Sequence, residues 1–201
     1  RRDFTINAMA INLQPPNYGD LTDPFNGVMD IEKKIIRTPL NPDETFSEDP
    51  LRMMRAGYFA SKLGFKVDSL CLRSIKNMAS RIDIVSIERI RDEFIKILTT
   101  NKPSIGLIIL QKTGLMKMVF PEIDVMYGMN QTSEWHHKDI FAHTLQVVDN
   151  AAILSEKMEL RFAALVHDIA KPNTRRIDKK RGYTFHGHDA VGEKMVDKIA
   201  L

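Results

Sequence analysis

Residues 47–65, SEDPLRMMRAGYFASKLGF, constrain the fold more than any other stretch of the chain. Proline has no amide hydrogen and fits an α-helix only in its first turn, so a helix here must begin close to Pro50. Ser47 or Asp49 can cap that beginning, because a short oxygen-bearing side chain accepts hydrogen bonds from first-turn amides. The apolar residues that follow have the spacing of a buried helix face: Leu51, Met54 and Tyr58. The stretch therefore predicts an amphipathic helix with a defined start.

A second face of this helix carries Asp49, Arg52 and Arg55, three residues apart. A carboxylate only accepts hydrogen bonds and a guanidinium only donates them, so Asp49 and Arg52 match an edge that offers a donor beside an acceptor. Cytosine and adenine have such an edge, whereas uracil and guanine place a carbonyl beside a ring N–H. A buried mismatch costs on the order of 1–3 kcal/mol per group, enough to select C and A without a template. The alternative is an ordinary first-turn acid followed by solvated arginines.

The composition is that of a globular protein, with 201 residues, 43% hydrophobic and 27% charged. A net charge of +3 and a pI near 8.9 are compatible with RNA binding without requiring it. Cys71 is the single cysteine, which excludes an internal disulfide and indicates a reducing, cytoplasmic compartment. The longest apolar run, around residues 107–110, is too short to span a membrane. The chain starts with Arg rather than Met and stops within a helical pattern, so we expect it to be a piece of a longer protein.

The first 46 residues predict the end of a small β-sheet. Residues 1–13 alternate in part between apolar and polar side chains, which indicates a strand. The Asn26-Gly27 pair is typical of a hairpin turn, and a second strand is expected over residues 28–37.

Helices follow. We expect one over residues 69–80, capped by Asp68 or Ser69, and one over 87–99, capped by Ser86. A further helix should run from Pro103 to Gly114, with a connector after it. The expected buried residues of the helix over 87–99 are Ile87, Ile90, Phe94, Ile97 and Leu98. The polar stretch 128–134 predicts a domain boundary.

All six histidines lie in the last third of the chain. His143 falls in an apolar helical pattern, His167-Asp168 ends a second one, and His188 enters a third. A single histidine on an apolar face is usually just packed, but three separated segments that each supply one predict a metal site. The remaining histidines fit less well: His136 and His137 lie in an expected exposed loop, and His186 is uncertain.

Several motifs in register resemble the tRNA nucleotidyltransferases (CCA-adding enzymes) and bacterial poly(A) polymerases. RRDFTINAMA at 1–10 is similar to the ribose motif of that family, DPFNGVMDI at 23–31 to its Asp-Gly-Asp turn, EDPLRMMRA at 48–56 to its base-selecting motif, and SIERIRDEF at 86–94 to a later helix. The resemblance runs essentially end to end.

This resemblance implies a template-independent transferase that adds C and A from CTP and ATP to the tRNA 3′ end, with Mg²⁺. It implies nucleotide binding by Arg2, Asn7, Asp49, Arg52 and Arg55. Supporting roles fall to Asp23, Gly27, Asp30, Arg89 and Arg91, although Arg89 and Arg91 could equally be surface charges. The family holds its catalytic metals with a Gly-Ser segment and Asp-x-Asp, which this sequence lacks, so we expect the chain alone to be inactive in nucleotide transfer.

The histidine segments resemble the HD phosphohydrolase superfamily. By that resemblance His143, His167, Asp168 and His188 would bind a divalent transition metal, and Lys171 would face phosphate. The superfamily has a further distal Asp, which Asp189 and Asp197 do not match clearly.

The sequence thus predicts a mainly α fold in three parts. Residues 1–46 would be a β remnant of a nucleotidyltransferase palm, 47–130 a helical neck that binds nucleotide and RNA, and 131–201 an all-α HD domain. The alternatives are a poly(A) polymerase, a free-standing HD phosphohydrolase with a helical accessory domain, and a helical RNA-binding module with a decayed metal site.

Overall fold

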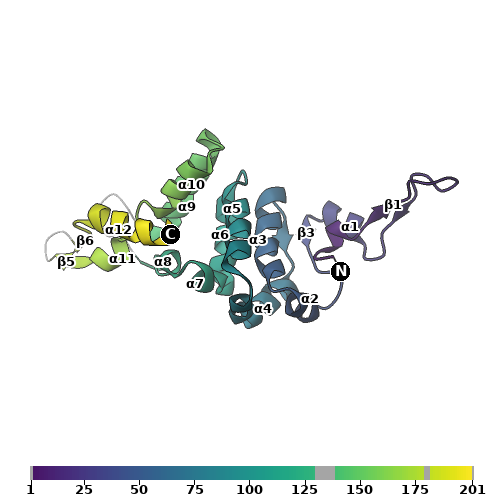
Figure 1. Ribbon diagram of the computed structural model, residues 1–201, viewed down its shortest axis with the longest axis horizontal. Helices are drawn as coiled ribbons and strands as arrows, with labels where there is room; N and C mark the ends of the chain where they lie inside the picture. The colour runs from purple at the N-terminus through teal and green to yellow at the C-terminus, as the bar shows by residue number, and fades with distance from the viewer. Residues whose placement is uncertain (1, 130–138, 179–181, 201) are drawn as a thin grey trace.

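The computed structural model describes residues 2–129, 139–178 and 182–200. Helices dominate, and the three small sheets have two strands each, which confirms the mainly helical fold class. The described parts are strung along one long axis, with the β1 hairpin at one end, α3, α5 and α6 in the middle, and β5 and α12 at the other end (Figure 1). Among the described residues, no helix is long and apolar enough to cross a membrane.

The amino-terminal part contains a 3-10 turn η1 (Thr5–Asn7), the antiparallel strands β1 (Ala10–Ile11) and β2 (Leu21–Thr22), and helix α1 (Gly27–Glu32). The predicted hairpin at Asn26-Gly27 is therefore wrong, because a helix begins there. The carboxylate of Asp23 explains the difference: it accepts hydrogen bonds from the amides of Gly27 at 2.7 Å and Val28 at 3.0 Å, and so caps α1.

The strand predicted over residues 28–37 shrinks to β3 (Ile35–Ile36). This strand pairs in parallel with β4 (Lys66–Val67), which lies beyond the first long helix. The side chain of Ile36 is fully buried. The amino-terminal part and the helical part are therefore joined by backbone hydrogen bonds as well as by packing.

The stretch that opened the sequence analysis contains two helices, α2 (Pro42–Glu48) and α3 (Leu51–Leu63), with a break at residues 49–50. Pro50 precedes α3, as its missing amide hydrogen allows. Asp49 Oδ1 accepts from the amide of Leu51 at 3.2 Å, which is a capping contact, whereas Ser47 belongs to α2. Helix α2 was not predicted; the side-chain oxygen of Asn41 caps it by accepting from the amide of Asp43.

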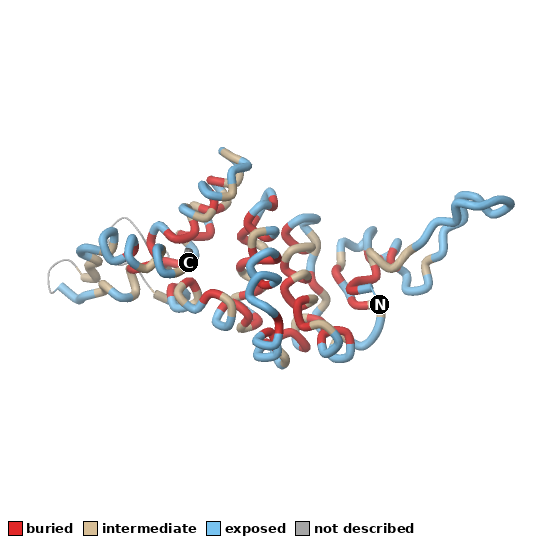
Figure 2. Tube along the Cα trace, in the orientation of Figure 1, coloured by how far each residue is buried: buried red, intermediate tan, exposed pale blue. Residues whose placement is uncertain are grey.

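The middle of the molecule is a bundle built on α3, with α4 (Ser69–Met78), α5 (Ile87–Leu98) and α6 (Pro103–Thr113). A 3-10 segment, η2 (Ala79–Ile84), follows α4, and α7 (Leu115–Val119) and α8 (Pro121–Asp124) follow α6. Buried residues line the facing sides of α3, α5 and α6 (Figure 2). The predicted caps hold at Asp68, which accepts from the amide of Leu70, and at Gly114, which has a left-handed backbone. Ile87 was expected to be buried and is 68% exposed.

The last part contains α9 (Ile140–Leu154), α10 (Met158–Val166), α11 (Lys171–Thr174) and α12 (His188–Ala200). Besides these helices it has an antiparallel hairpin of β5 (Arg176–Asp178) and β6 (Gly182–Thr184). His136 and His137 lie outside the described residues, as does most of the predicted boundary at 128–134.

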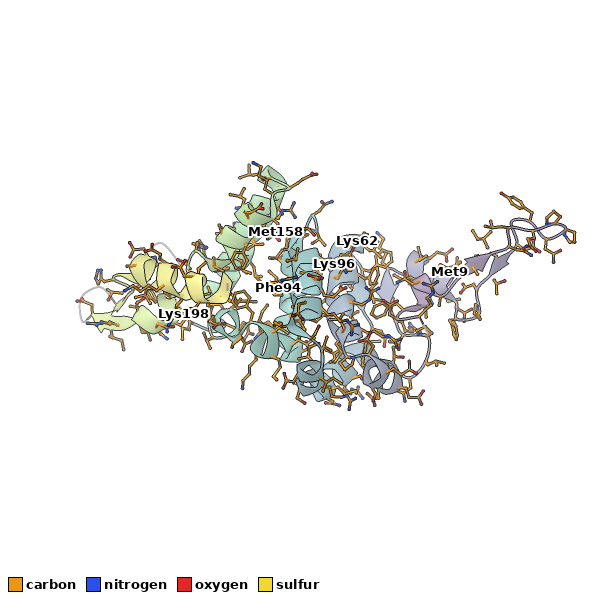
Figure 3. All side chains as sticks on the ribbon, viewed as in Figure 1. Met9, Lys62, Phe94, Lys96, Met158 and Lys198 are labelled. Atoms are coloured by element: carbon orange, nitrogen blue, oxygen red, sulfur yellow. The ribbon has the colours of Figure 1, made fainter. Side chains whose placement is uncertain are left out.

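A groove of about 650 Å³ lies where α5 meets this last part. Phe94 of α5 and Met158 of α10 both line it, and both are labelled in Figure 3.

Candidate functional site

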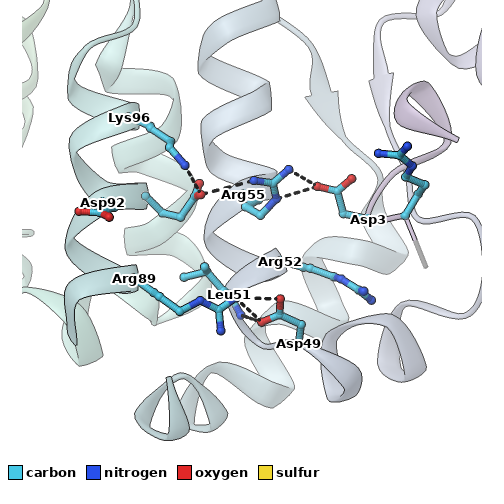
Figure 4. A pocket seen from close by; sticks show the side chains of 10 residues that line it. Asp3, Asp49, Leu51, Arg52, Arg55, Arg89, Asp92 and Lys96 are labelled. Atoms are coloured by element: carbon cyan, nitrogen blue, oxygen red, sulfur yellow. Dashed lines mark hydrogen bonds and ion pairs between the residues drawn. The ribbon is translucent and has the colours of Figure 1, made fainter. Parts of the chain in front are cut away.

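A pocket of about 440 Å³ opens between the amino-terminal segment, α3 and α5 (Figure 4). Its lining is ionisable except for one leucine and consists of Arg2, Asp3, Asp49, Leu51, Arg52, Arg55, Arg89, Asp92, Glu93 and Lys96. Arginine and lysine together with carboxylates suit a charged, hydrogen-bonding ligand. Segments that are far apart in the sequence thus converge on one cavity, which the sequence analysis expected for Arg2, Asp49, Arg52 and Arg55.

Asp49 stands at the start of α3, and Arg89 of α5 holds its carboxylate. Arg89 Nη2 lies 3.1 Å from Oδ2 and 3.4 Å from Oδ1 of Asp49. About a third of the Asp49 side chain remains exposed, so its oxygens stay accessible from the pocket.

Arg52 is fixed by the end of α2. Its Nη1 donates to the carbonyl oxygen of Thr45 at 3.0 Å and to Glu48 Oε2 at 3.1 Å. Figure 4 shows the Arg52 side chain extending toward the amino-terminal segment, whereas Asp49 turns toward Arg89. The two side chains share a pocket, and their joint reading of a base edge stays a prediction.

Arg55 lies between two buried carboxylates. Its Nε and Nη2 both lie 2.7 Å from Asp3 Oδ2, and its Nη1 lies 3.4 Å from Glu93 Oε1. Lys96 donates to the same Glu93 oxygen at 2.7 Å, while no hydrogen-bond donor among the described residues reaches the buried Oε2. Burial alone would raise the pKa of Asp3, but hydrogen bonds from Asn7 and Arg55 hold that pKa below its ordinary value.

The sequence analysis missed Asp3 and Glu93 as site residues. Their pairing with Arg55 spans 52 and 38 residues, which no local pattern reports. Asp3 lies in the motif RRDFTINAMA and Glu93 in the motif SIERIRDEF, and their place in these two family motifs is the sequence feature that could have indicated a role in the site. Asn7 acts here through Asp3, because its Nδ2 donates to Asp3 Oδ1 at 3.1 Å.

Arg91 does not share the environment of Arg89. It lines the 650 Å³ groove on another face of α5 and pairs with Asp92 at 3.2 Å. Of the two arginines expected to support the base-selecting residues, Arg89 is the one that touches Asp49.

The amino-terminal part is held together by contacts of three predicted supporting residues, Asp23, Gly27 and Asp30. Asp30 is buried, accepts from the hydroxyl of Thr5 at 2.7 Å, and lies 3.6 Å from Arg37 Nη2. A Cβ on Gly27 would stand 2.4 Å from the carbonyl oxygen of Thr5, so the close approach requires glycine. Asp30 and Gly27 both contact Thr5, and so they hold the 3-10 turn η1 that follows Asp3.

A second cluster joins three of the helices in the last part. His143, His167 and Asp168 present ligand atoms that all lie within 4.8 Å of one another. Asp168 Oδ2 lies 3.1 Å from His167 Nε2 and 3.7 Å from His143 Nε2, and Asp168 Oδ1 lies 3.7 Å from His188 Nε2. Three of the four residues expected from the sequence, the histidines, therefore surround the carboxylate of the fourth, Asp168.

Backbone carbonyls orient two of these imidazoles. His167 Nδ1 lies 2.8 Å from the carbonyl oxygen of Ala164, and His188 Nδ1 lies 2.8 Å from that of Phe185. In a neutral imidazole whose Nδ1 donates its proton to such a carbonyl, Nε2 carries the lone pair that a metal would bind, in place of the contact that His167 Nε2 makes with Asp168 here. Imidazole nitrogens with one carboxylate form a donor set that fits a divalent transition metal.

Lys171 contributes the local positive charge, with its Nζ 2.7 Å from Asp168 Oδ2. Burial would raise the pKa of Asp168, but hydrogen bonds from His167 and Lys171 lower it to about 2. The hydrogen bond to Asp168 also raises the pKa of His167. His186, Asp189 and Asp197 are exposed, and the described contacts do not place them in the cluster.

Three segments of the chain match known protein families. Residues 1–37 match the family described as poly(A) polymerase head domain, residues 64–127 match a probable RNA and SrmB-binding site of polymerase A, and residues 140–201 match the HD domain.

Among curated relatives, the multifunctional CCA proteins of Shewanella frigidimarina and Vibrio campbellii are 36% and 37% identical over 205 residues. Each alignment covers 99% of this chain and 47% or 48% of the relative. This chain spans about half the length of the curated relatives it matches.

Among solved structures, the Bacillus stearothermophilus CCA-adding enzyme in complex with CTP has a TM-score of 0.64 and 28% identity, covering 98% of this chain and 43% of that one. A tRNA nucleotidyltransferase complexed with a primer tRNA and an incoming ATP analogue also has a TM-score of 0.64 and 28% identity, covering 83% of this chain and 47% of that one.

The fold, the two sites and these matches define a polymerase-type head and RNA-binding region followed by an HD domain. The chain belongs to the family of CCA-adding enzymes and poly(A) polymerases that carry an HD domain.

Proposed function

We propose that this chain is the nucleotide-selecting and HD-containing part of a tRNA nucleotidyltransferase, which adds C and A from CTP and ATP to the tRNA 3′ end in the cytoplasm. One observation carries the proposal: Asp49 and Arg52 line the same polar pocket as Arg2 and Arg55. The similarity to enzymes solved with CTP, and with a primer tRNA and an ATP analogue, supports it.

In this proposal Asp49 accepts a hydrogen bond from the amino group of cytosine or adenine, and Arg52 donates to the adjacent ring nitrogen. Arg89 orients Asp49 by donating a hydrogen bond to its carboxylate, and the Thr45 carbonyl of α2 orients Arg52 by accepting one. Arg2 and Arg55 offer positive charge to the nucleotide phosphates, and Asn7 keeps Asp3 in place.

The same pocket does not fit the catalytic Mg²⁺. Magnesium needs carboxylate oxygens that are free to coordinate it. The four carboxylates that line the pocket each pair with an arginine or a lysine: Asp3, Asp49, Asp92 and Glu93. The Glu93 Oε2 atom, which no described donor reaches, is buried. With the missing Asp-x-Asp motif, this supports the proposal that residues 1–201 bind nucleotide without transferring it.

The test is equilibrium binding of CTP, ATP, UTP and GTP to residues 1–201. We expect CTP and ATP to bind more tightly than UTP and GTP, by about 1–3 kcal/mol for each mismatched group. Asp49→Ala should abolish this preference, and the surface variant Arg73→Met should retain it. Equal binding of all four nucleotides by the wild-type chain would refute base selection, and incorporation of labelled CTP or ATP into tRNA would refute the predicted inactivity.

We propose a second activity, metal-dependent phosphohydrolysis, at the histidine cluster. His143, His167, Asp168 and His188 would hold a divalent transition metal, and their donor set fits one. A bound metal supplies a water of lowered pKa and charge stabilisation for phosphoryl oxygens. Lys171 places a positive charge beside the cluster, where it can bind a phosphate oxygen.

This cluster also supports the alternative of a free-standing HD phosphohydrolase with a helical accessory domain. The two functions separate by mutation in a full-length protein: Asp49→Ala should remove C and A selection and spare phosphatase activity, and His167→Ala should do the reverse. Phosphatase activity without any preference among the four nucleotides would favour the free-standing phosphohydrolase.

A third alternative is an RNA-binding module whose metal site has decayed, and elemental analysis that finds no bound metal would favour it. A poly(A) polymerase would use the same pocket and would differ by extending RNA with A alone.

A further inference from the structure

Two polar contacts connect the helices that carry the histidine cluster to α5 and α6 in the middle of the molecule. The first involves Arg161, which lies in α10 six residues before His167 and is 2% exposed. Its Nη1 donates to the carbonyl oxygens of Leu98 at 2.8 Å and Thr100 at 2.7 Å, at the end of α5. The helix that leads into His167 and Asp168 is thus fastened to the helix that carries Arg89 and Glu93.

The same guanidinium also reaches the end of α9. Its Nε donates to the carbonyl oxygen of Ser155 at 2.9 Å, and its Nη2 donates to that of Ala152 at 3.2 Å. The last carbonyls of a helix have no partner within it and carry the negative end of its dipole. One buried positive charge therefore stabilises the ends of α5 and α9 together.

The second contact involves Asp149, on the helix that carries His143. Its Oδ1 accepts from the amide of Ser104 at 3.0 Å, and its Oδ2 accepts from the Ser104 hydroxyl at 2.7 Å. Ser104 lies in the first turn of α6, whose free amides favour a carboxylate. Asp149 therefore fixes α9 against α6, one and a half turns from His143.

The two halves of the cluster share the Arg161 anchor, which reaches both α5 and α9, and α9 has the Asp149 anchor in addition. His143 lies on α9, whereas His167 and Asp168 follow α10. Helices α9 and α10 pack directly against each other, and they also contact α6 and α5. Helices α5 and α6 in turn pack with α3, where Gly57 and Gly106 approach closely. We propose that Arg161 and Asp149 are positioning residues for the metal centre and that α5 and α6 act as its framework.

This inference rests on the proposed metal site, so the experiment begins with that site. Co²⁺ is titrated into residues 1–201, and both its dissociation constant and its visible absorption spectrum, which reports coordination geometry, are recorded. The wild-type chain should bind Co²⁺, and His167→Ala should not. If the wild type fails to bind Co²⁺, the metal site itself is refuted.

Given binding by the wild type, Arg161→Met and Asp149→Asn should each weaken Co²⁺ binding by about tenfold or more, as is typical of groups that orient metal ligands. Their spectra should change in shape, which a loss of stability alone would not cause. Arg161→Lys should recover part of the affinity, because an ammonium can still reach some of the carbonyls.

Arg73→Met, a matched loss of an exposed arginine on α4, is the control and should bind Co²⁺ like the wild type. Thermal unfolding checks that each variant is folded at the assay temperature, and Asp149→Asn serves if Arg161→Met does not fold. Dissociation constants within twofold of the wild type with an unchanged spectrum would overturn the inference and leave the metal site standing.

Discussion

Arg55 binds Asp3 through two nitrogens, Nε and Nη2, each 2.7 Å from the same carboxylate oxygen, Oδ2. This contact joins α3 to the amino-terminal segment across the opening of the pocket (Figure 4). Asp3 is only 7% exposed. If its carboxylate lost its charge, the partly buried guanidinium of Arg55 would lose the acceptor that lies closest to it.

Asp3→Asn should therefore lower the free energy of unfolding by roughly 1.5–3 kcal/mol at neutral pH, the range for hydrogen bonds to charged groups. The effect should depend on pH with a definite sign. The pKa of Asp3 in the folded protein lies below the ordinary value of 3.8, so its stabilisation is present above that value and is lost as the pH falls through the folded pKa. Urea unfolding at neutral pH and near pH 3 should show the two proteins converging in acid. An equal difference at both pH values would contradict this account, and the exposed Asp20→Asn is the control.

Gly27→Ala should destabilise the amino-terminal part, because its Cβ would overlap the carbonyl oxygen of Thr5. We expect a loss of roughly 1–3 kcal/mol, the usual cost of overpacking. Gly192→Ala is the matched control: its nearest neighbour would be the Ala170 Cβ at 3.7 Å, and alanine favours the helix there. Thermal unfolding of the two variants measures the contrast, and equal melting temperatures would refute it.

Arg89→Met and Arg91→Met should separate two neighbouring arginines of α5. Only the first removes a contact with Asp49, so it should weaken CTP binding by up to about 1 kcal/mol, roughly fivefold in Kd. The second should leave CTP binding unchanged. Calorimetric titration measures the Kd for CTP of both variants. An equal loss of affinity in both would mean that CTP binding depends on positive charge in general and not on the contact between Arg89 and Asp49.

Lys171→Met should tighten Co²⁺ binding by the histidine cluster. The ammonium lies 2.7 Å from Asp168 Oδ2, where it competes with a cation for that oxygen. The same variant should bind inorganic phosphate more weakly in the presence of metal. Calorimetry gives both constants, and weaker Co²⁺ binding by Lys171→Met would show that the lysine supports the site instead of competing with it.

Bound metal should stabilise the chain by mass action. At about 100 times its dissociation constant a metal that binds the folded state alone adds about 2.7 kcal/mol. Adding a chelator should remove this gain, and His143→Ala should show no gain at all. Thermal unfolding with and without Co²⁺ measures the effect, and a shift that persists in His143→Ala would place the ion elsewhere.

The helices with clear end signals could be predicted from the sequence. Asp68, Pro103 and Gly114 mark real boundaries because each acts through its own local backbone chemistry. The Asn26-Gly27 prediction is wrong because the carboxylate of Asp23, four residues before Gly27, caps a helix that begins at that pair. Helix α2 was not predicted although Asn41 and Pro42 are ordinary start signals, because Pro50 is a second start signal only eight residues later and α2 is just seven residues long.

For the sites, residue types at fixed spacing indicated which side chains would converge, and the histidine cluster is the clearest case. The partners of those side chains could not be predicted. Asp3 and Glu93 meet Arg55 only because α3, α5 and the amino-terminal segment pack together, and the orientation of Arg52 depends on a helix that had not been recognised.

The parallel pairing of β3 with β4 has a practical consequence for anyone exchanging parts between relatives. A chimaera joined after residue 46 would take Ile35 and Ile36 from one parent and Lys66 and Val67 from the other, although these residues are neighbours in one sheet. A chimaera that takes both strands from the same parent preserves the pairing of β3 with β4. The segment to exchange as one unit therefore extends from the amino terminus to at least Val67.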